Sequence, residues 1–377
     1  MSSQKIKIGV DARPLSYGIT GNSRYLFEAL KYLVREDSRY YFTLFCNKPI
    51  DSIFQPFLQE NAGLLEVVCK RSIGFIWLHL FLPRLLRKHQ IELFWGTLQL
   101  LPFRKLSIPS IVNYHDLNFI SAPQTMARLN YHQHKLFSPR SLQNADRVLC
   151  LSENTKNEII NLQADWQEKL EVIYPGVALP EVNHKGTAMK ELPELYFFTL
   201  GTLEPRKNIQ TLINAYLKLK KEKPNLSYSL VIAGRKGWGE GELSERLFSG
   251  DLEEQGVYFI ENPDEAYLDR LYVHASAFCF PSLHEGFGLP ILEALIRQKV
   301  CLVSDIPVFR EIVDSEIDFL LAAQDVGAWK NALAKLADMQ NMQRKPAWDA
   351  SQWTWNTTAR KIESILDFYS KKETHAV

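Results

Sequence analysis

The segment His-Glu-Gly-Phe-Gly-Leu-Pro-Ile-Leu-Glu, residues 284–293, places two carboxylates around a glycine-rich turn and a proline. It follows an apolar run typical of a buried strand, and Pro290 suits the first residue of a helix, because proline's missing N–H is not needed there. The backbone N–H groups of Gly288, Leu289 and Ile291 would then be available to an anion. A diphosphate is the anion that this pattern favours.

The two carboxylates suggest what else is bound. Glu285 would precede the helix and Glu293 would lie in its first turn, so both can accept hydrogen bonds from hydroxyls on either side of a diphosphate. A nucleotide sugar has hydroxyls in that arrangement, on its ribose and on its hexose. A simpler interpretation is that Glu293 only stabilises the helix N-terminus and Glu285 is a solvated loop residue. We expect His284 to pack or to line the pocket rather than to donate a proton.

Further polar residues follow two other predicted strands. Arg206 and Lys207 precede a helix that begins near residue 209, where their cations can meet a diphosphate, although such a pair in a turn can also be merely solvated. His115 ends the run at residues 110–114, and a lone histidine is usually structural. No Asp-x-Asp pair occurs in the chain. We therefore predict no metal site, and expect basic side chains and helix dipoles to neutralise the negative charge of the diphosphate.

The elements that position these residues alternate between short apolar runs and longer amphipathic segments, the pattern of parallel sheets flanked by helices. The predicted strands lie at residues 6–10, 41–46, 65–68, 93–95, 110–114 and 147–151, then at 196–200, 227–233, 257–260, 277–280 and 300–303; helices are predicted at 22–34, 139–145 and 357–369. This predicts an α/β protein with two doubly wound, Rossmann-like domains.

An irregular stretch separates the two sets of strands. Residues 178–193 have no clear period and contain two prolines and a glycine, which is typical of a linker. We predict a first domain at residues 1–180, a linker at 181–193 and a second domain at 194–352. We expect the C-terminal helix, within residues 353–372, to pack back on the first domain.

Bulk composition excludes several classes of protein. A chain of 377 residues is long enough for two domains, and its formal net charge of +1 gives no support to a nucleic-acid partner. Its five cysteines are scattered and mostly lie in apolar runs, which predicts buried thiols in a reducing cytosol. The N-terminus has no signal-peptide pattern, and we predict a cytoplasmic protein.

The most apolar segment, residues 73–82, is about half the length that a bilayer requires. It continues into Pro-Arg-Leu-Leu-Arg-Lys at residues 83–88. One interpretation is a buried helix whose last turn carries cations. The other is a patch that touches the cytoplasmic face of the inner membrane or a lipid-linked acceptor.

The motifs together resemble those of retaining glycosyltransferases of family 4, group 1, which have the GT-B fold of two Rossmann-like domains facing a central cleft. The resemblance covers nearly the whole chain. It rests on the E-x7-E pattern of Glu285 and Glu293 and on four other segments, which are Gly-Thr-Leu-Glu-Pro-Arg-Lys-Asn at residues 201–208, Pro-Gly-Val at 175–177, Ser-Glu-Asn-Thr at 152–155 and Tyr-His-Asp-Leu at 114–117.

This resemblance implies roles for individual residues. His115 would be the active-site histidine near the sugar and acceptor, with Asp116 orienting it or the acceptor. Glu285 would hold the donor hexose and Glu293 the ribose, while Arg206 and Lys207 bind the diphosphate. The predicted catalytic residues are therefore His115, Asp116, Glu285, Arg206 and Lys207, and the predicted donor-binding residues are Gly21, Gly201, Thr202, Arg206, Lys207, His284, Glu285, Gly286, Phe287, Gly288, Leu289 and Glu293.

The chain departs from the family's pattern in three places. A Gly-Ile-Gly loop that closes over the donor phosphates is here Gly21-Asn22-Ser23, and Thr202 stands where many members have an arginine. After Glu293 the common Ala-x-Gly-x-Pro-Val is replaced by Ile-Arg-Gln-Lys-Val-Cys, residues 296–301. None of these changes removes a residue that the proposed chemistry requires.

The resemblance is strongest to bacterial polysaccharide and O-antigen mannosyltransferases. It implies transfer of mannose from GDP-mannose, with the donor as substrate and no cofactor, to a glycan or lipid-linked saccharide. Transfer of glucose or N-acetylhexosamine from a UDP-sugar is the alternative. A sugar-nucleotide epimerase, a phosphorylase, a non-catalytic sugar-binding protein and a dinucleotide-dependent oxidoreductase are more remote; the last has no complete G-x-G-x-x-G after the first strand.

Overall fold

The computed structural model describes residues 5–123, 126, 128–179, 192–237, 241–339, 344 and 347–373. The chain forms two compact units. The first consists of residues 1–120, 126–176 and 351–377, and the second of residues 121–125 and 177–350. Most of the predicted linker, residues 181–191, lies outside the described part of the chain.

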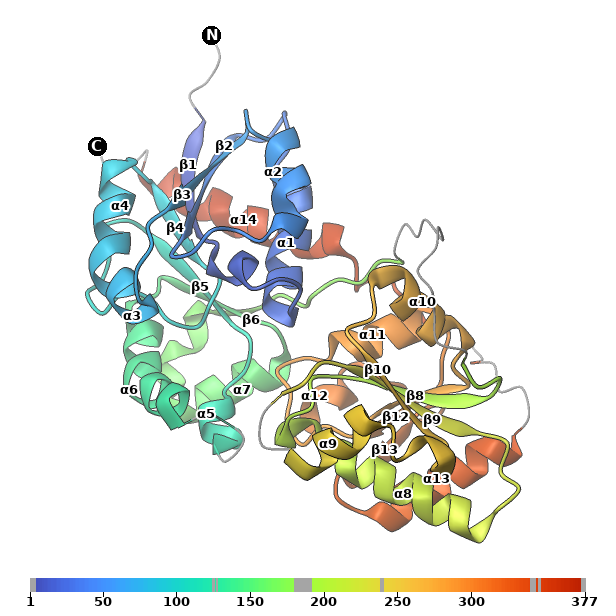
Figure 1. Cartoon of the computed structure of the whole chain (residues 1–377). Helices are drawn as coiled ribbons and strands as arrows, with labels where there is room; N and C mark the ends of the chain where they lie inside the picture. Colours follow the sequence, from blue (N-terminus) through green and yellow to red (C-terminus); the bar gives the residue numbers. More distant parts are fainter. Residues whose placement is uncertain are drawn as a thin grey trace. The chain divides into compact units, whose positions relative to one another are not determined.

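The first unit is built on a parallel sheet in the order β3-β2-β1-β4-β5-β6-β7 (Figure 1). Its strands are β1 (Ile6–Asp11), β2 (Tyr40–Cys46), β3 (Leu65–Cys69), β4 (Leu93–Gly96), β5 (Ser110–Tyr114), β6 (Arg147–Cys150) and β7 (Leu170–Val172). Its helices are α1 (Gly21–Leu33), α2 (Gln55–Glu60), α3 (Gly74–Ile76), α4 (Leu82–Lys88), α5 (Asn118–Ser121), α6 (Arg128–Asn144), α7 (Glu153–Leu162) and α14 (Trp355–Glu373), and a π-helical turn (Trp77–Phe81) joins α3 to α4.

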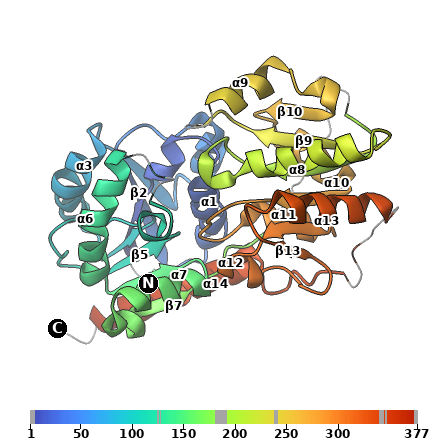
Figure 2. The same ribbon diagram turned by 90° about the horizontal axis from the view of Figure 1, so that it is seen from below.

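The second unit has a parallel sheet in the order β10-β9-β8-β11-β12-β13. Its strands are β8 (Tyr196–Leu200), β9 (Ser229–Gly234), β10 (Val257–Glu261), β11 (Ala277–Phe280), β12 (Cys301–Ser304) and β13 (Phe319–Leu321). Its helices are α8 (Ile209–Glu222), α9 (Gly241–Ser249), α10 (Glu265–His274), α11 (Leu289–Ile296), α12 (Pro307–Arg310) and α13 (Val326–Asp338). Helices α8 and α13 lie side by side on one face of this sheet (Figure 2).

Both sheets have the strand order of a Rossmann fold, so the prediction of an α/β protein with two doubly wound domains is confirmed. The central strands are buried on both faces, which explains why they are continuous apolar runs in the sequence. In each sheet the direction of winding reverses between two adjacent strands, β1 and β4 in the first and β8 and β11 in the second. Ligands of such sheets bind beyond the carboxyl ends of the strands at this reversal.

Several local predictions are wrong. The helix expected at residues 139–145 is the end of the longer α6, which contains Pro139 in its interior. Helix α11 begins at Leu289, so Pro290 is its second residue rather than its first. The edge strands β7 and β13 were not predicted, because each has only three residues.

The C-terminal helix α14 belongs to the first unit, as predicted, and packs against α1. Its buried side chains are Trp355, Ala359, Ile362, Ile365 and Leu366. The chain enters this helix against Gly176, where a Cβ atom would lie 2.1 Å from the backbone nitrogen of Trp355. Only glycine permits so close an approach of the two backbone segments.

Candidate active site

Two loops of the second unit leave the same edge of the sheet. Strand β8 continues into residues 201–208 and β11 into residues 281–288, and the two strands are direct neighbours at the winding reversal. Most of the residues predicted to bind the donor therefore lie together at the place where this fold binds ligands.

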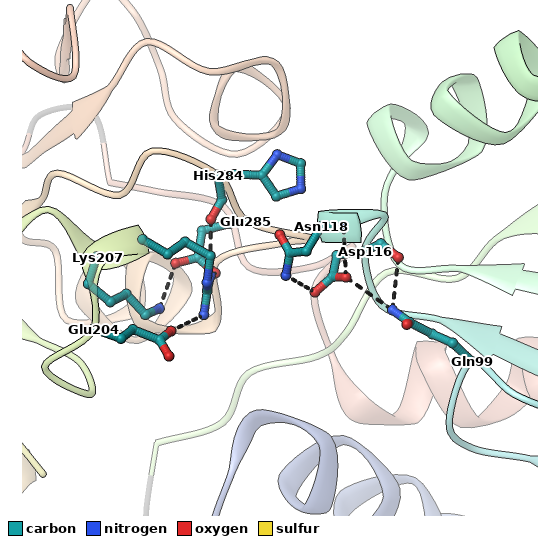
Figure 3. A network of polar contacts seen from close by, with 8 residues as sticks. Gln99, Asp116, Asn118, Glu204, Lys207, His284 and Glu285 are labelled. Atoms are coloured by element: carbon teal, nitrogen blue, oxygen red, sulfur yellow. Dashed lines mark hydrogen bonds and ion pairs between the residues drawn. The ribbon is translucent and has the colours of Figure 1, made fainter. Parts of the chain in front are cut away.

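At this edge Glu285 is paired with two cations (Figure 3). Its carboxylate accepts hydrogen bonds from Arg206 Nη1 at 2.5 Å and from Lys207 Nζ at 2.6 Å. Arg206 Nη2 also donates to Glu204 Oε1 at 2.6 Å. The four side chains form a cluster with two positive and two negative charges, and each is at most 18% exposed.

The cluster fixes the ionisation of its members. Burial alone would raise the pKa of Glu285, but Arg206 and Lys207 hold that pKa at about 2. Burial lowers the pKa of Lys207, and Glu285 opposes this effect. At neutral pH Glu285 is therefore a carboxylate, which can accept hydrogen bonds from hydroxyl groups but cannot donate a proton.

Backbone contacts hold the two loops together. Arg206 Nη1 donates to the carbonyl oxygen of His284 at 3.0 Å, and the N–H of Leu283 donates to the carbonyl oxygen of Arg206 at 2.8 Å. Asn208 has a left-handed backbone with φ 53°, and its amide donates to the carbonyl oxygens of Pro281 and Ala323 at 3.0 and 2.7 Å. These bonds place Arg206 and Glu285 at fixed positions before any ligand binds.

Glu293 is placed differently from the prediction. It is the fifth residue of α11 and therefore lies beyond its first turn. Its carboxylate is buried and accepts a hydrogen bond from the Tyr272 hydroxyl at 2.8 Å. The Arg297 side chain donates to the carbonyl oxygen of Glu293 and forms an ion pair with Asp269 at 2.6 Å. Helix α10, which carries Tyr272, thus sets the orientation of Glu293.

The start of α11 offers fewer donors than expected. The N–H of Ile291 donates to the carbonyl oxygen of Gly288 at 2.9 Å, so the expectation that it is available to an anion is wrong. In the part of the chain that the structure describes, the N–H groups of Gly288 and Leu289 donate to no protein acceptor. Gly288 has φ 139°, which favours glycine.

The remaining donor-side residues line the same two loops. Thr202 accepts a hydrogen bond from Arg235 Nε at 3.3 Å, and Gly201 packs against the Lys207 side chain. Gly286 and Phe287 are buried, and the His284 ring leaves its buried Nε2 without a hydrogen-bond partner among the described residues.

In the first unit His115 follows β5, beside the carboxyl end of β4. Its Nε2 donates to the carbonyl oxygen of Thr97 at 2.7 Å, and the Thr97 hydroxyl donates to the carbonyl oxygen of Asp11 at 2.5 Å. Burial lowers the pKa of His115, so the ring is neutral at pH 7 and its Nδ1 is left as the acceptor. The Tyr25 ring meets His115 edge-on at 5.8 Å.

Asp116 does not orient His115 by a hydrogen bond, because Thr97 holds the ring. The carboxylate instead accepts from the backbone N–H and the side-chain amide of Asn118 at 3.1 and 2.7 Å, and from Gln99 Nε2 at 3.1 Å (Figure 3). Neutral amides therefore fix this anion at the end of β5. Orientation of His115 through the charge of Asp116 and orientation of the acceptor by Asp116 both stay predictions.

Gly21 is the first residue of α1, which Thr20 caps. The Ser23 hydroxyl, where the family has glycine, accepts from the N–H of Thr20 at 2.7 Å and so completes a capping box. A Cβ at Gly21 would meet no atom within 4 Å. The fold of the first unit therefore does not itself require glycine at this position.

The residues of these sites that were not predicted include Glu204, Thr97, Asn208 and Tyr272. Glu204 stands beside the predicted cations, and its charge next to Arg206 could have pointed to it. Thr97, Asn208 and Tyr272 act through partners that lie 18 to 115 positions away in the sequence. No local motif identifies such contacts.

Two families match consecutive parts of the chain. Glycosyltransferase Family 4 matches residues 19–180, and Glycosyl transferases group 1 matches residues 183–353. O-antigen chain mannosyltransferase B of Escherichia coli is 27% identical over 328 residues, which are 82% of this chain and 84% of that protein. O-antigen chain mannosyltransferase RfbU of Salmonella typhimurium is 27% identical over 60% of this chain and 61% of its own length.

A similar solved structure is that of HepE from Anabaena in complex with UDP. It has a TM-score of 0.68 and 17% sequence identity, and the match covers 96% of this chain and 99% of that one. The two Rossmann-like units have the GT-B fold of this structure, and the two glycosyltransferase families together match residues 19–180 and 183–353. The chain belongs to the family 4, group 1 glycosyltransferases.

Proposed function

We propose that the protein transfers mannose from GDP-mannose to a glycan or a lipid-linked saccharide in the synthesis of a bacterial surface polysaccharide. The observation that carries this proposal is the pairing of Glu285 with Arg206 and Lys207 at the reversal of the second sheet. The O-antigen mannosyltransferases among the relatives support the choice of mannose.

The contacts of the second unit suggest how the donor binds. An ammonium group has three donors, and Lys207 gives one to Glu285, so it can bind a diphosphate oxygen as well. The N–H groups of Gly288 and Leu289 supply further donors at the positive end of α11. In this proposal Glu285 accepts from the hexose hydroxyls and the buried Glu293 accepts from the ribose.

We propose a retaining reaction. The bond between the anomeric carbon and the diphosphate breaks, the acceptor oxygen attacks the same face, and the departing phosphate oxygen takes the acceptor's proton. Arg206 and Lys207 stabilise the charge of the leaving group without a metal ion. His115, with its neutral Nδ1, and Asp116 would contact the sugar and the acceptor.

A UDP-sugar is the second candidate donor, because HepE, a protein of the same fold, was solved in complex with UDP. Purified protein should be melted in the presence of GDP, UDP, ADP and their sugar conjugates, with Glu293→Ala as the control. Stabilisation by GDP and GDP-mannose that the variant loses supports the proposal. Stabilisation by UDP-sugars alone would replace mannose transfer with the second candidate.

The transfer itself needs a separate assay. Radiolabelled GDP-mannose is incubated with the protein and lipid-linked saccharides from bacterial membranes, and the α- or β-configuration of the new linkage is read by NMR. In the product, the anomeric carbon of the transferred mannose should have the same configuration as in GDP-mannose. An inverted product would rule out the retaining mechanism, and donor binding without transfer to any saccharide would favour a non-catalytic sugar-binding protein.

A further inference from the structure

The helical run at residues 74–88 of the first unit has two unlike faces. Its inner face, formed by Trp77, Leu78, Leu82 and Leu86, is buried in the core of the unit. Its outer face continues from Ile73 through Ile76 and Leu80 to Arg84 and Arg87, and these positions are three or four residues apart. They therefore form one stripe along the helix, apolar at its start and cationic at its end.

Apolar side chains on this outer face are unusually exposed. The exposed fractions are 73% for Ile73, 45% for Phe75 and 52% for Leu80. Phe103, on the loop between β4 and β5, is 51% exposed, and its N–H donates to Nδ1 of His79 at 3.0 Å. We call Ile73, Phe75, Ile76, Leu80 and Phe103 the apolar surface.

The apolar surface is held in place by packing beneath it. Phe75 contacts the ring of Phe137 on α6 with centroids 5.2 Å apart, and Phe103 contacts the same ring at 6.4 Å. Three segments that are distant in sequence thus meet here, and α3 and α6 lie side by side in both views (Figures 1 and 2). The exposed side chains project from a rigid base.

The charged residues within the segments that form the apolar surface all have one sign. Asp and Glu number 43 in the chain, yet none occurs at residues 67–91, 93–115 or 128–144, which form this part of the unit. The exposed cations there that form no ion pair with a described residue are Lys70, Arg71, Arg84, Arg87, Lys88, Arg104, Arg128, Lys135 and Arg140. An apolar centre with a cationic border complements an anionic lipid surface.

We propose that the apolar surface and its cationic border bind the anionic face of a lipid bilayer. The side chains of Ile73, Phe75 and Leu80 enter the headgroup region, and Arg84 and Arg87 bind lipid phosphates. A second copy of the chain fits less well, because a symmetric contact would bring like charges together. This proposal depends on the proposed function in one respect only, which is that membrane binding would bring the protein to a lipid-linked acceptor.

No helix in the part of the chain that the structure describes has the length and hydropathy needed to cross a membrane. Binding at the surface of the bilayer is therefore tested by co-sedimentation of the full chain with vesicles. One set contains 30% phosphatidylglycerol in phosphatidylcholine, and the other is phosphatidylcholine alone. We expect binding to the anionic vesicles to be at least tenfold tighter, because each cation near an anionic surface contributes about fivefold.

Two double variants test the two parts of the surface. Arg84→Glu with Arg87→Glu should weaken binding to anionic vesicles at least tenfold, and Ile73→Asn with Leu80→Asn should do the same. Lys218→Glu with Lys221→Glu on α8 of the second unit, which has the same spacing and is also exposed, should change binding less than twofold. All six side chains are exposed, so the melting temperatures should stay unchanged.

Three results would overturn the proposal. These are no binding to either vesicle, binding that Arg84→Glu with Arg87→Glu leaves unchanged, and a dimer in size-exclusion chromatography that Ile73→Asn with Leu80→Asn abolishes. The rise in melting temperature that GDP and GDP-mannose cause is measured on the same protein samples. Its absence would contradict the proposed function, whereas loss of vesicle binding alone would contradict only the membrane surface.

Discussion

Glu285 shows how one buried charge is kept in place by its neighbours. Arg206 and Lys207 are themselves largely buried, so removal of the carboxylate breaks the ion pair of Lys207 and one ion pair of Arg206, which keeps its pair with Glu204. Glu285→Gln should therefore lower the free energy of unfolding by about 3 kcal/mol, as for other broken buried pairs. Urea denaturation measures this effect. Asp305→Asn, which breaks the exposed pair with Arg310, should have a much smaller effect.

The effect of Glu285→Gln on the free energy of unfolding should depend on pH. Because the pKa of Glu285 is about 2 in the folded protein and about 4.3 in an unfolded chain, its stabilising contribution is complete above pH 4.3. The contribution is lost as the pH falls towards 2. The difference in stability between the wild type and Glu285→Gln should shrink over this range. A difference that stays constant down to pH 2 would contradict the pairing.

His115 should make the first unit sensitive to mild acid. Burial lowers its pKa below the unfolded value of about 6.5, so the folded state disfavours the proton. Its contribution to stability is complete above pH 6.5 and is lost as the pH falls below it. His115→Gln should therefore flatten the loss of stability between pH 7 and 5, measured by chemical denaturation. His132→Gln, an exposed histidine of the same unit, should leave the curve as it is.

Tyr272 orients the second carboxylate of the E-x7-E pair through its hydroxyl. Tyr272→Phe keeps the ring packing and removes this bond, so nucleotide affinity should fall about tenfold, the value of one hydrogen bond to a charged group. Tyr216→Phe is the matched control, because it removes a buried hydroxyl bond to the Tyr228 carbonyl oxygen elsewhere in the same unit. Calorimetric titration with the nucleotide measures the affinity of both variants, and only Tyr272→Phe should bind more weakly than the wild type. Equal affinities would show that Tyr272 does not position Glu293.

Among the elements, the junction of β8 and α8 depends on the left-handed backbone of Asn208. Asn208→Gly keeps this conformation and loses only the side-chain bonds to Pro281, Ala323 and Thr211, whereas Asn208→Ala loses the same bonds and adds backbone strain of about 1–2 kcal/mol. Alanine should thus be more destabilising than glycine by about that amount in urea denaturation. Alanine as stable as glycine would mean that the junction relaxes without strain.

The elements also show what the sequence could predict. Eleven strands were found because central parallel strands are buried on both faces and form apolar runs, such as Ala277–Phe280. The strands that were missed, β7 and β13, are three-residue edge strands. Likewise, Arg206, Lys207 and Glu285 belong to local motifs and could be named in advance. Their pairing across 78 or 79 positions depends on the adjacency of β8 and β11, which no local pattern shows.

At the scale of the molecule, the chain returns to its first unit after completing the second. Gly176 admits the backbone at Trp355, and the Thr358 hydroxyl donates to the carbonyl oxygen of Tyr174 at 2.8 Å. The first unit is therefore complete only when α14 has been made. The second unit is formed without α14.

This arrangement predicts unequal effects of a C-terminal truncation. A chain that ends after residue 350 loses the buried side chains of α14, of which Trp355, Ile362 and Leu366 each contribute about 1.5–3 kcal/mol. The first unit should then unfold or be cut rapidly by protease, while the second keeps its fold. Nucleotide binding, which we assign to the second unit, should survive. Gly176→Val in the full chain should reproduce the effect, because its side chain would displace the same helix. If the truncated chain instead loses nucleotide binding and keeps a protease-resistant first unit, the assignment of α14 to that unit is wrong.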